Sequence, residues 1–200
     1  MAQTPIVYII AGPNGAGKTT FANEFLPNFE DCREFVNVDL MASGLSPFSP
    51  RSVNVTAGKL GLNRIKELAA ARKTFGFEST LAGKTYLRFL NILKKRGYEI
   101  RIYFLWIQNV ELAVKRVQER VKKGGHSVPQ EDIRRRYTAG LKNLFFHYRH
   151  YADFIAIIDN STEKPGLIAI GDSKRYRSNR KQVIEKMKAK TGFPVDWQGD

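Results

Sequence analysis

The segment GPNGAGKTT, residues 12–20, carries the residue types and the spacing that bind a phosphate group. Its glycines let successive backbone N–H groups approach an anion closely, and the helix that follows adds the positive end of its dipole. In the GxxxxGK[ST] pattern the lysine reaches the β- and γ-phosphates, and the next hydroxyl binds Mg²⁺. We therefore predict a nucleoside triphosphate site, with Lys18 on the phosphates and Thr19 on the metal ion. The predicted binding residues are Gly12, Pro13, Asn14, Gly15, Ala16, Gly17, Lys18, Thr19 and Thr20.

Two acidic residues stand where predicted strands end, at the edge where an open α/β sheet places its ligand. Asp39 closes a strand predicted over 34–39, and its carboxylate can accept the proton of a hydroxyl that is being phosphorylated. A helix N-cap or turn aspartate is the alternative, and the position favours the base. Glu78 closes a strand predicted over 75–79, where it either holds the water shell of Mg²⁺ or binds a substrate hydroxyl.

Two hydroxyl residues follow Glu78 directly. Ser79 and Thr80 either cap the next helix, which is the favoured interpretation, or bind the phosphate acceptor. The candidates for substrate binding are thus Asp39, Glu78, Ser79 and Thr80, and the candidates for metal binding are Thr19 and Glu78.

Five arginines flank the loop GGHSVP at residues 124–129: Arg116, Arg120, Arg134, Arg135 and Arg136. Phosphoryl transfer needs cations on the moving phosphate, best brought by a lid that also excludes water. We expect a lid around residues 116–136 in which two arginines act, Arg120 before the loop and Arg134 after it. His126 either contacts phosphate or is an ordinary surface histidine, which is the commoner outcome.

Three absences narrow the class of P-loop protein. The chain has no NKxD motif for guanine recognition, no LSGGQ-like signature of a transporter ATPase and no array of P-loop repeats. The small kinases remain among the candidates.

The elements that must position these residues alternate between strands and helices. Strands are predicted over 6–11, 34–39, 75–79, 99–107, 153–158 and 167–171, and helices after Thr19 and over 50–73, 84–96, 109–123 and 130–151. In the helix over 109–123, one stripe predicted to be buried comprises Val110, Ala113, Val114, Val117 and Val121. This alternation predicts one α/β domain over residues 1–200, with a mainly parallel sheet covered by helices on both faces.

Charge and composition limit the kinds of partner that the chain is expected to bind. The net charge of +14 favours anionic partners. Residues 173–190 hold eight lysines and arginines and one glutamate, which predicts either a nucleic-acid patch or, preferably, a basic C-terminal helix over 178–190. In that helix Val183, Ile184 and Met187 would face the body. A single cysteine, no export signal and no apolar run long enough to span a membrane lead us to expect a cytoplasmic protein.

Taken together, these segments resemble the zeta toxin family of P-loop kinases, in particular its short bacterial members described as predicted ATPases. The resemblance runs through AGPNGAGKTT, FVNVDLMASGLSP, FGFESTLAG, RVQERVKKGGHSVPQEDIRRRY and YADFIAIIDNS. It implies a three-layer P-loop kinase core with strand order 2-3-1-4-5. It also implies ATP- and Mg²⁺-dependent phosphorylation of a sugar hydroxyl, with UDP-N-acetylglucosamine the acceptor in well-known members, and an antitoxin protein as partner.

The family roles then fall on Lys18 (phosphates), Asp39 (base), Glu78 (acceptor or metal), Arg120 and one of the arginines 134–136. Our hypothesis is a kinase that moves the γ-phosphate of ATP to a hydroxyl of a small acceptor, such as a UDP-N-acetyl sugar. Two rivals stay open: a kinase acting on a nucleic-acid end, and a nucleotide-gated ATPase that switches between protein partners.

Overall fold

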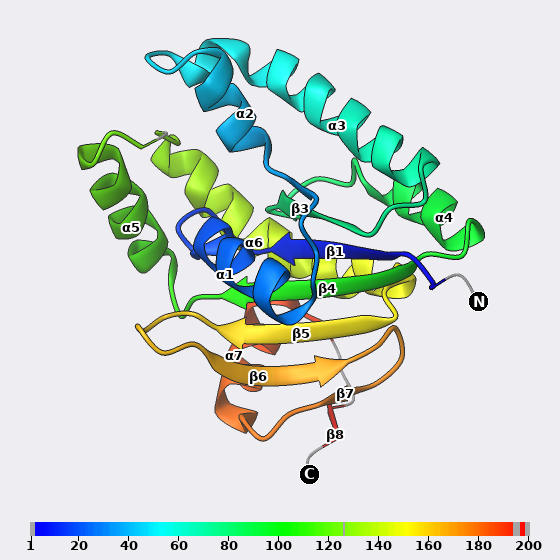
Figure 1. Ribbon diagram of the computed structural model, residues 1–200. Helices are drawn as coiled ribbons and strands as arrows, with labels where there is room; N and C mark the ends of the chain where they lie inside the picture. Colours follow the sequence, from blue (N-terminus) through cyan, green and yellow to red (C-terminus); the bar gives the residue numbers. More distant parts are fainter. Residues whose placement is uncertain (1–2, 126, 194–196, 199–200) are drawn as a thin grey trace.

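Strand β1 (Ile6–Ala11) lies in the middle of the molecule and is buried on both faces (Figure 1). The computed structural model describes residues 3–125, 127–193 and 197–198. Successive side chains of a strand point to opposite faces, and β1 uses this alternation fully. Val7 and Ile9 pack into one core cluster, whereas Tyr8 and Ile10 pack into another on the opposite face. The end of β1 therefore holds the phosphate loop at a fixed place.

The sheet has eight strands in the order β2-β3-β1-β4-β5-β6-β7-β8. The first five are parallel, which confirms the predicted order 2-3-1-4-5. They are β2 (Phe35–Val36), β3 (Phe75–Ser79), β1, β4 (Glu99–Trp106) and β5 (Phe154–Asp159). Strand β6 (Gly166–Gly171) runs antiparallel to β5, β7 (Tyr176–Arg177) antiparallel to β6, and β8 (Trp197–Gln198) parallel to β7.

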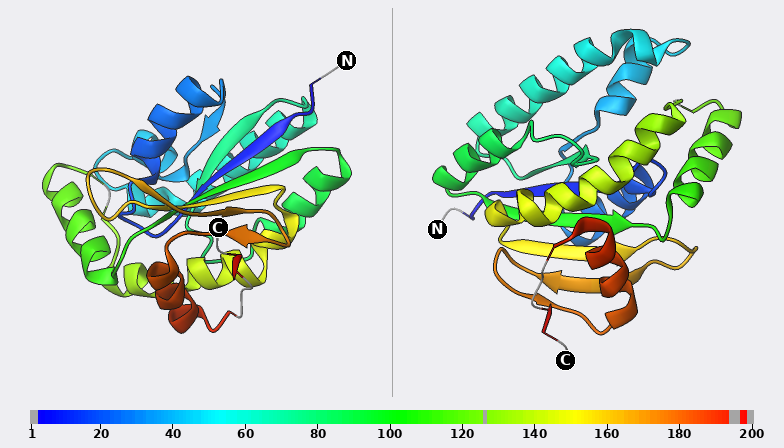
Figure 2. Two further views of the ribbon diagram at one scale, coloured as in Figure 1. Left: turned by 90° about the horizontal axis from the view of Figure 1, so that it is seen from below. Right: turned by 180° about the vertical axis from the view of Figure 1, so that it is seen from behind.

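Helices cover the sheet unequally on its two faces. The helices are α1 (Lys18–Phe29), α2 (Val38–Leu45), α3 (Asn54–Ala70), α4 (Leu87–Lys95), α5 (Val110–Lys122), α6 (Gln130–Phe146) and α7 (Lys181–Thr191). Two 3₁₀ turns, η1 (Pro50–Val53) and η2 (Tyr148–Tyr151), accompany them. Residues of α1 pack on one face, and those of α3, α4, α6 and α7 on the other (Figure 2). The predicted three-layer α/β class is confirmed.

Helices α5 and α6 form a hairpin beside the carboxyl end of β4. Ala113 and Val117 of α5 meet Ile133 of α6 in a small core that also holds Leu105 and Ile107. Arg134 of α6 pairs with Glu111 of α5 at 3.0 Å. The hairpin thus stands next to the phosphate loop, where we expected a lid.

Several predicted bounds were wrong. The strand predicted over 34–39 ends at Val36, because Asn37 caps helix α2, which we had not predicted. The helix predicted over 50–73 is the 3₁₀ turn η1 followed by α3. The helix predicted over 130–151 ends at Phe146, and η2 follows it in the chain. The helix predicted over 84–96 starts only at Leu87, and α7 lies three residues beyond the predicted start of 178.

Two buried faces can be compared with their predictions. In α5, Ala113, Val114 and Val117 are buried as expected, but Val121 is 38 % exposed because it lies in the last turn, beyond the contact with α6. In α7, Ile184 and Met187 are buried and Val183 packs against them, which confirms the amphipathic helix. Among the described residues, no helix combines the length and the apolar composition needed to cross a membrane.

Candidate functional site

The phosphate loop between β1 and α1 depends on three glycines with positive φ. These angles are 137° at Gly12, 77° at Gly15 and 82° at Gly17. A Cβ at Gly15 would lie 2.7 Å from the carbonyl oxygen of Ala113, and one at Gly17 would lie 2.6 Å from Asn160 Nδ2. Other residues adopt such angles at a cost, so glycine alone fits the cradle without strain.

The start of helix α1 points its unsatisfied N–H groups toward this loop. Gly17 is the N-cap and provides no side-chain hydrogen bond, so the first turn has no cap of its own. Lys18 is buried, with its side chain 5 % exposed, and its Nζ lies 3.0 Å from the carbonyl oxygen of Pro13. A buried ammonium beside an uncapped helix start forms a site for an anion.

Glu78 joins the loop to the neighbouring strand. Its Oε2 accepts hydrogen bonds from Thr19 Oγ1 at 2.7 Å and from Asn37 Nδ2 at 2.8 Å. Its Oε1 lies 3.5 Å from Lys18 Nζ, and the side chain is 11 % exposed. Asn37 also accepts the N–H of Leu40 as the N-cap of α2. Both oxygens of Glu78 are therefore engaged within this cluster.

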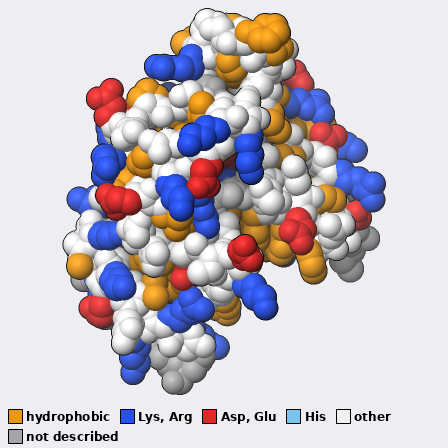
Figure 3. Space-filling view, turned by 90° about the vertical axis from the view of Figure 1, so that its left-hand side faces the viewer, with side chains coloured by type: hydrophobic (Ala, Val, Ile, Leu, Met, Phe, Trp, Pro, Cys, Tyr) orange, Lys and Arg blue, Asp and Glu red, His pale blue; other side chains and the backbone are white. Residues whose placement is uncertain are grey.

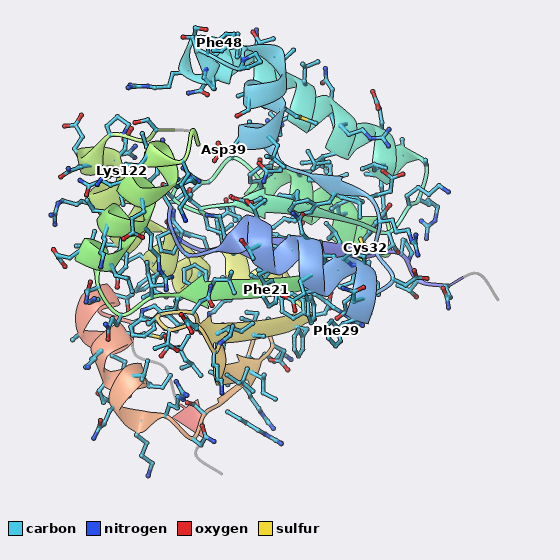
Figure 4. The ribbon with its side chains drawn as sticks, turned by 60° about the vertical axis from the view of Figure 1, so that its left-hand side comes forward. Phe21, Phe29, Cys32, Asp39, Phe48 and Lys122 are labelled. Atoms are coloured by element: carbon cyan, nitrogen blue, oxygen red, sulfur yellow. The ribbon has the colours of Figure 1, made fainter. Side chains whose placement is uncertain are left out.

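Asp39 lies in the first turn of α2, two residues after the N-cap, and not at the end of a strand. It is partly exposed, and its carboxylate makes no hydrogen bond or ion pair with any residue that the structure describes. Helix α2 and the segment up to η1 form a projecting arm, which carries Phe48 at its tip. Figure 4 shows Asp39 between this arm and helix α5, which carries Lys122. Unlike Glu78, this carboxylate is available to accept a proton.

Two adjoining cavities meet at these residues. The first, which we call the P-loop cavity, measures about 180 Å³ and is lined by Gly15, Gly17, Thr19, Thr20, Arg116 and Arg120. The second, the β3 cavity, measures about 300 Å³ and is lined by Asn37, Val38, Gly58, Leu62, Ser79, Thr80, Thr85, Tyr86 and Arg136. Both are also lined by Asn14, Lys18, Asp39 and Glu78. These four residues form the boundary between the cavities.

The edge that carries the cavities is rich in positive charge. In Figure 3, which faces the carboxyl ends of the parallel strands, lysine and arginine side chains surround the acidic ones. Hydrophobic side chains gather at the tip of the arm formed by α2 and the segment up to η1, where Phe48 is fully exposed.

Arg116 fastens the phosphate loop to the segment after β5. Its guanidinium donates to the carbonyl oxygens of Asn160 at 2.7 Å and Ser161 at 2.9 Å, and lies 3.5 Å from that of Gly15. Asn160 in turn donates from Nδ2 to the carbonyl oxygen of Ala16 at 2.7 Å. These bonds hold the backbone of the loop in its curved form.

The predicted arginines divide between the cavities and the surface. Arg120 lines the P-loop cavity and Arg136 the β3 cavity. Arg134 lines neither, because its turn of α6 faces Glu111 of α5, and Arg135 pairs with Asp132 at 2.7 Å. The geometry therefore brings Arg120 to the site but replaces Arg134 with Arg136. His126 lies outside the described residues.

Ser79 and Thr80 line the β3 cavity but do not cap α4. Helix α4 starts at Leu87 after Tyr86, which gives no side-chain cap. Ser79 Oγ instead accepts the N–H of Leu81, and Thr80 Oγ1 that of Ala82. The capping interpretation was wrong because six residues separate Thr80 from the helix start. Burial raises the pKa of Tyr86, on the same cavity, so its phenol stays protonated at neutral pH.

A family model now adds to the geometry. The model described as "Zeta toxin" matches residues 50–167, more than half of the chain. The chain belongs to the zeta toxin family. The match covers η1 to the start of β6, so the P-loop motif at residues 12–20 is an independent observation.

Relatives of this zeta toxin family member are distant in sequence. An uncharacterized protein of Haemophilus influenzae is 27 % identical over 126 residues, which are 63 % of this chain and 88 % of that protein. The crystal structure of AvrRxo1-ORF1:-ORF2 with ATP superposes with a TM-score of 0.76 at 15 % identity, covering 98 % of this chain and 66 % of the other. The PezAT toxin–antitoxin system of Streptococcus pneumoniae gives a TM-score of 0.60 at 18 % identity, covering 82 % and 72 %. At such identities the two structures show a shared fold, and this chain spans 66 % of the AvrRxo1 chain.

The zeta toxin site fits a triphosphate on the evidence of its own atoms. Asn14 Oδ1 is buried without a hydrogen-bond partner among the described residues, and Asn14 borders both cavities. A buried polar atom without a partner is costly, and an amide oxygen only accepts hydrogen bonds, so Mg²⁺ or a metal-bound water would relieve the cost. The phosphate oxygens are suited instead by the uncapped N–H groups of α1 and by Lys18. Thr19 and Glu78 are the residues that would hold Mg²⁺, directly or through water. The described residues contain no cluster of three or more metal-binding side chains, and a phosphate-bound Mg²⁺ takes only one or two from the protein.

Sequence reasoning missed two residues of the site, Asn37 and Asn160, and among the arginines 134–136 it favoured Arg134 over Arg136. The signal for Asn37 was present, because an Asn before an apolar run is a good N-cap, and an N-cap after β2 had to lie beside the phosphate loop. Asn160 follows β5 directly, at the same edge of the sheet, but nothing in the sequence links it to Ala16.

The two asparagine caps provide a matched test of the Glu78 cluster. Asn37 and Asn109 both cap helices from extended backbone, but only Asn37 also donates to a partly buried carboxylate, that of Glu78. We expect Asn109→Ala to lower the free energy of unfolding by about 1 kcal/mol and Asn37→Ala by about 2–3 kcal/mol, because the second also breaks a charge-assisted hydrogen bond. Urea denaturation of both variants measures the difference. Equal losses would mean that the bond from Asn37 to Glu78 contributes nothing to stability.

Proposed function

We propose that this chain transfers the γ-phosphate of ATP to a hydroxyl group of a small acceptor in the β3 cavity, with a UDP-N-acetyl sugar as the acceptor to test first. Membership of the zeta toxin family supports the reaction class. The observation that carries the proposal is the carboxylate of Asp39, which has no partner among the described residues and borders both cavities.

The P-loop cavity is the proposed site of the phosphates. Backbone N–H groups of the loop and of the first turn of α1 bind their oxygens, and Lys18 neutralises the charge between the β- and γ-positions. Lys18 Nζ now lies beside Pro13 and Glu78, within reach of both cavities. The ATP in the AvrRxo1-ORF1:-ORF2 crystal structure, which shares this fold, supports the choice of nucleotide.

The proposed transfer step moves one proton and one phosphoryl group. The acceptor hydroxyl loses its proton to the Asp39 carboxylate while its oxygen forms a bond to the γ-phosphorus. The bond from that phosphorus to the β–γ bridging oxygen breaks, and ADP leaves with the electron pair. Mg²⁺ held at Thr19 and Glu78 would supply charge neutralisation on the phosphate oxygens. Glu78 is less suited to be the base because both of its oxygens are already engaged.

The arginines of the α5–α6 hairpin complete the charge balance. Arg120 lines the P-loop cavity and is proposed to bind the moving phosphoryl group. Arg136 lines the β3 cavity and is proposed to bind the acceptor. Arg134, which the sequence favoured, has no geometric support for such a role.

An antitoxin protein is the proposed macromolecular partner. The AvrRxo1 structures hold two proteins, ORF1 and ORF2, and PezAT is a toxin–antitoxin system, so chains of this fold assemble with a second protein. A cytoplasmic location follows from the need for ATP and remains part of the proposal.

The two rival functions receive less support from the geometry. A kinase for nucleic-acid ends needs a basic track that leads to the cavity, yet none of the residues 173–190 lines either cavity. A nucleotide-gated switch needs no second cavity beside the phosphates, yet the chain has one of about 300 Å³ with a carboxylate at its boundary.

Asp39→Asn tests the proposal most sharply, because it preserves the shape of the side chain and removes the base. We expect the rate of phosphate transfer to fall 10²- to 10⁴-fold while the affinity for Mg²⁺·ATP changes less than about threefold. Labelled ATP, Mg²⁺ and a metabolite extract, with UDP-N-acetylglucosamine run in parallel, give the measurement.

The unchanged chain is the control in the same extract. A labelled small molecule that disappears with Asp39→Asn supports the proposal. Label that appears only on oligonucleotides, or a variant that transfers phosphate at the parent rate, contradicts it.

Arg120→Ala and Arg134→Ala separate the sequence expectation from the geometry. We expect Arg120→Ala to lower kcat at least about 100-fold, since it removes a cation from the P-loop cavity. Arg134→Ala breaks only a half-exposed ion pair with Glu111, so we expect kcat to fall less than about threefold. Initial rates at saturating ATP provide the comparison, and the reverse order would restore Arg134 to the site.

A further inference from the structure

The turn at residues 79–83, which follows β3, contains a strained residue directly after Ser79 and Thr80, which line the β3 cavity. Leu81 has φ of 52°, in the left-handed region, and its side chain is buried at 1 % exposure. A residue with a Cβ pays about 1–2 kcal/mol for this conformation, so the surroundings must enforce it. Such strain is often kept where it places side chains for function.

The strained turn fixes the hydrogen-bonding role of the two cavity hydroxyls. Ser79 Oγ accepts the N–H of Leu81 at 3.1 Å, and Thr80 Oγ1 accepts that of Ala82 at 3.4 Å. A hydroxyl that accepts one bond still has its own proton to donate. Within the part of the chain that the structure describes, neither hydroxyl donates to any protein atom. The turn therefore offers two hydrogen-bond donors at the cavity.

Helix α6 and Tyr148, the first residue of η2, contact the backbone of this turn. Asn143 Nδ2 donates to the carbonyl oxygen of Leu81 at 2.7 Å, and the hydroxyl of Tyr148 donates to that of Gly83 at 2.7 Å. At Gly140 the helix touches the turn directly, because a Cβ there would collide with the carbonyl oxygen of Thr80. The carbonyl groups of Thr80, Leu81 and Gly83 thus all meet the stretch of chain from Gly140 to Tyr148.

The same face of α6 also brings a cation to the cavity. Arg136, Gly140 and Asn143 are spaced by four and three residues, so they lie on one face of the helix. Arg136 lines the β3 cavity, seven residues before the amide that holds Leu81. A single rigid helix therefore sets the distance between the guanidinium and the two hydroxyl donors.

We propose that Asn143 is a positioning residue for the acceptor: by holding Leu81 in its left-handed conformation, it keeps the Ser79 and Thr80 donors at a fixed place opposite Arg136. This inference rests on the proposed phosphotransferase function. It also defines the acceptor class, because a wall of two hydroxyl donors and a guanidinium binds oxygen atoms with lone pairs. The acceptor carries carbonyl, carboxylate or phosphoryl oxygens beside the hydroxyl that faces Asp39.

Asn143→Ala and the isosteric Asn143→Asp both remove the donor to Leu81. With UDP-N-acetylglucosamine as the acceptor probe, we expect the KM for the acceptor to rise about 10-fold or more, while the KM for ATP changes less than about twofold. Hydrogen exchange of the amides of Leu81 and Ala82 should become faster in both variants. Asn143→Asp keeps the side-chain volume, so it remains informative if Asn143→Ala folds poorly.

Tyr137→Phe is the matched control on the same helix. It removes a buried hydrogen bond of 2.6 Å from α6 to the carbonyl oxygen of Ile107, which is away from the turn. We expect it to lower stability but to leave the ratio of the two KM values and the exchange of Leu81 unchanged. A general loosening of α6 would change the KM ratio and the exchange of Leu81 in Tyr137→Phe as well as in the Asn143 variants. A positioning role of Asn143 changes them only in the Asn143 variants.

The outcomes separate this inference from the function on which it rests. An active parent chain whose Asn143 variants keep the acceptor KM, or change both KM values alike, overturns the inference and leaves the phosphotransferase in place. A parent chain that transfers no phosphate to the probe overturns the acceptor assignment, and the inference about acceptor binding falls with it.

Discussion

A buried lysine and a glutamate that is 11 % exposed, 3.5 Å apart, stand at the point on which the rest of the site depends. Lys18 belongs to the start of α1 and Glu78 to the end of β3, so their contact joins the phosphate loop to the neighbouring strand. Removing two charges from water costs more than their attraction returns unless further bonds satisfy them. Here Pro13, Thr19 and Asn37 supply those bonds. The cluster is a poor source of stability and a good preformed site for a polyanion.

The division into two cavities follows from that cluster. Asn14, Lys18, Asp39 and Glu78 border both spaces, so a group bound on one side meets a group bound on the other at this boundary. Phosphoryl transfer needs this arrangement, since donor and acceptor must approach in line while water is excluded. The α5–α6 hairpin supplies arginines to both cavities, Arg116 and Arg120 to the first and Arg136 to the second.

The parts of this fold that depend on local sequence could be predicted, and the parts that depend on tertiary packing could not. The phosphate loop is set by spacing over nine residues, and strand β1 by an apolar run of six, so both followed from the sequence. The antiparallel direction of β6 and the two-residue strands β7 and β8 depend on pairing partners that no short pattern encodes. Asp39 was placed at the right edge of the sheet but in the wrong element, because Asn37 ends the strand by capping a helix.

The arginines of α6 also could not be assigned from local sequence, because their directions differ within one helical turn. Arg134, Arg135 and Arg136 are consecutive, so they point in three directions about 100° apart, and only the packing of α6 decides which one meets the cavity. Ile133 and Leu141 are among the buried residues of α6 that fix this rotation. Asn143 lies beyond sequence reasoning for another reason, since its partner, the carbonyl oxygen of Leu81, is 62 residues away in the chain.

The central claim is that the cradle of Gly12–Thr20 grips the phosphates of a nucleotide. Titration calorimetry with ATP and Mg²⁺ tests it most directly, on the unchanged chain and on Lys18→Ala. The account predicts binding of one nucleotide per chain, weakened at least about 10-fold in the variant by the loss of a charge-assisted contact. No heat of binding in the unchanged chain, or equal affinity in both proteins, would contradict it.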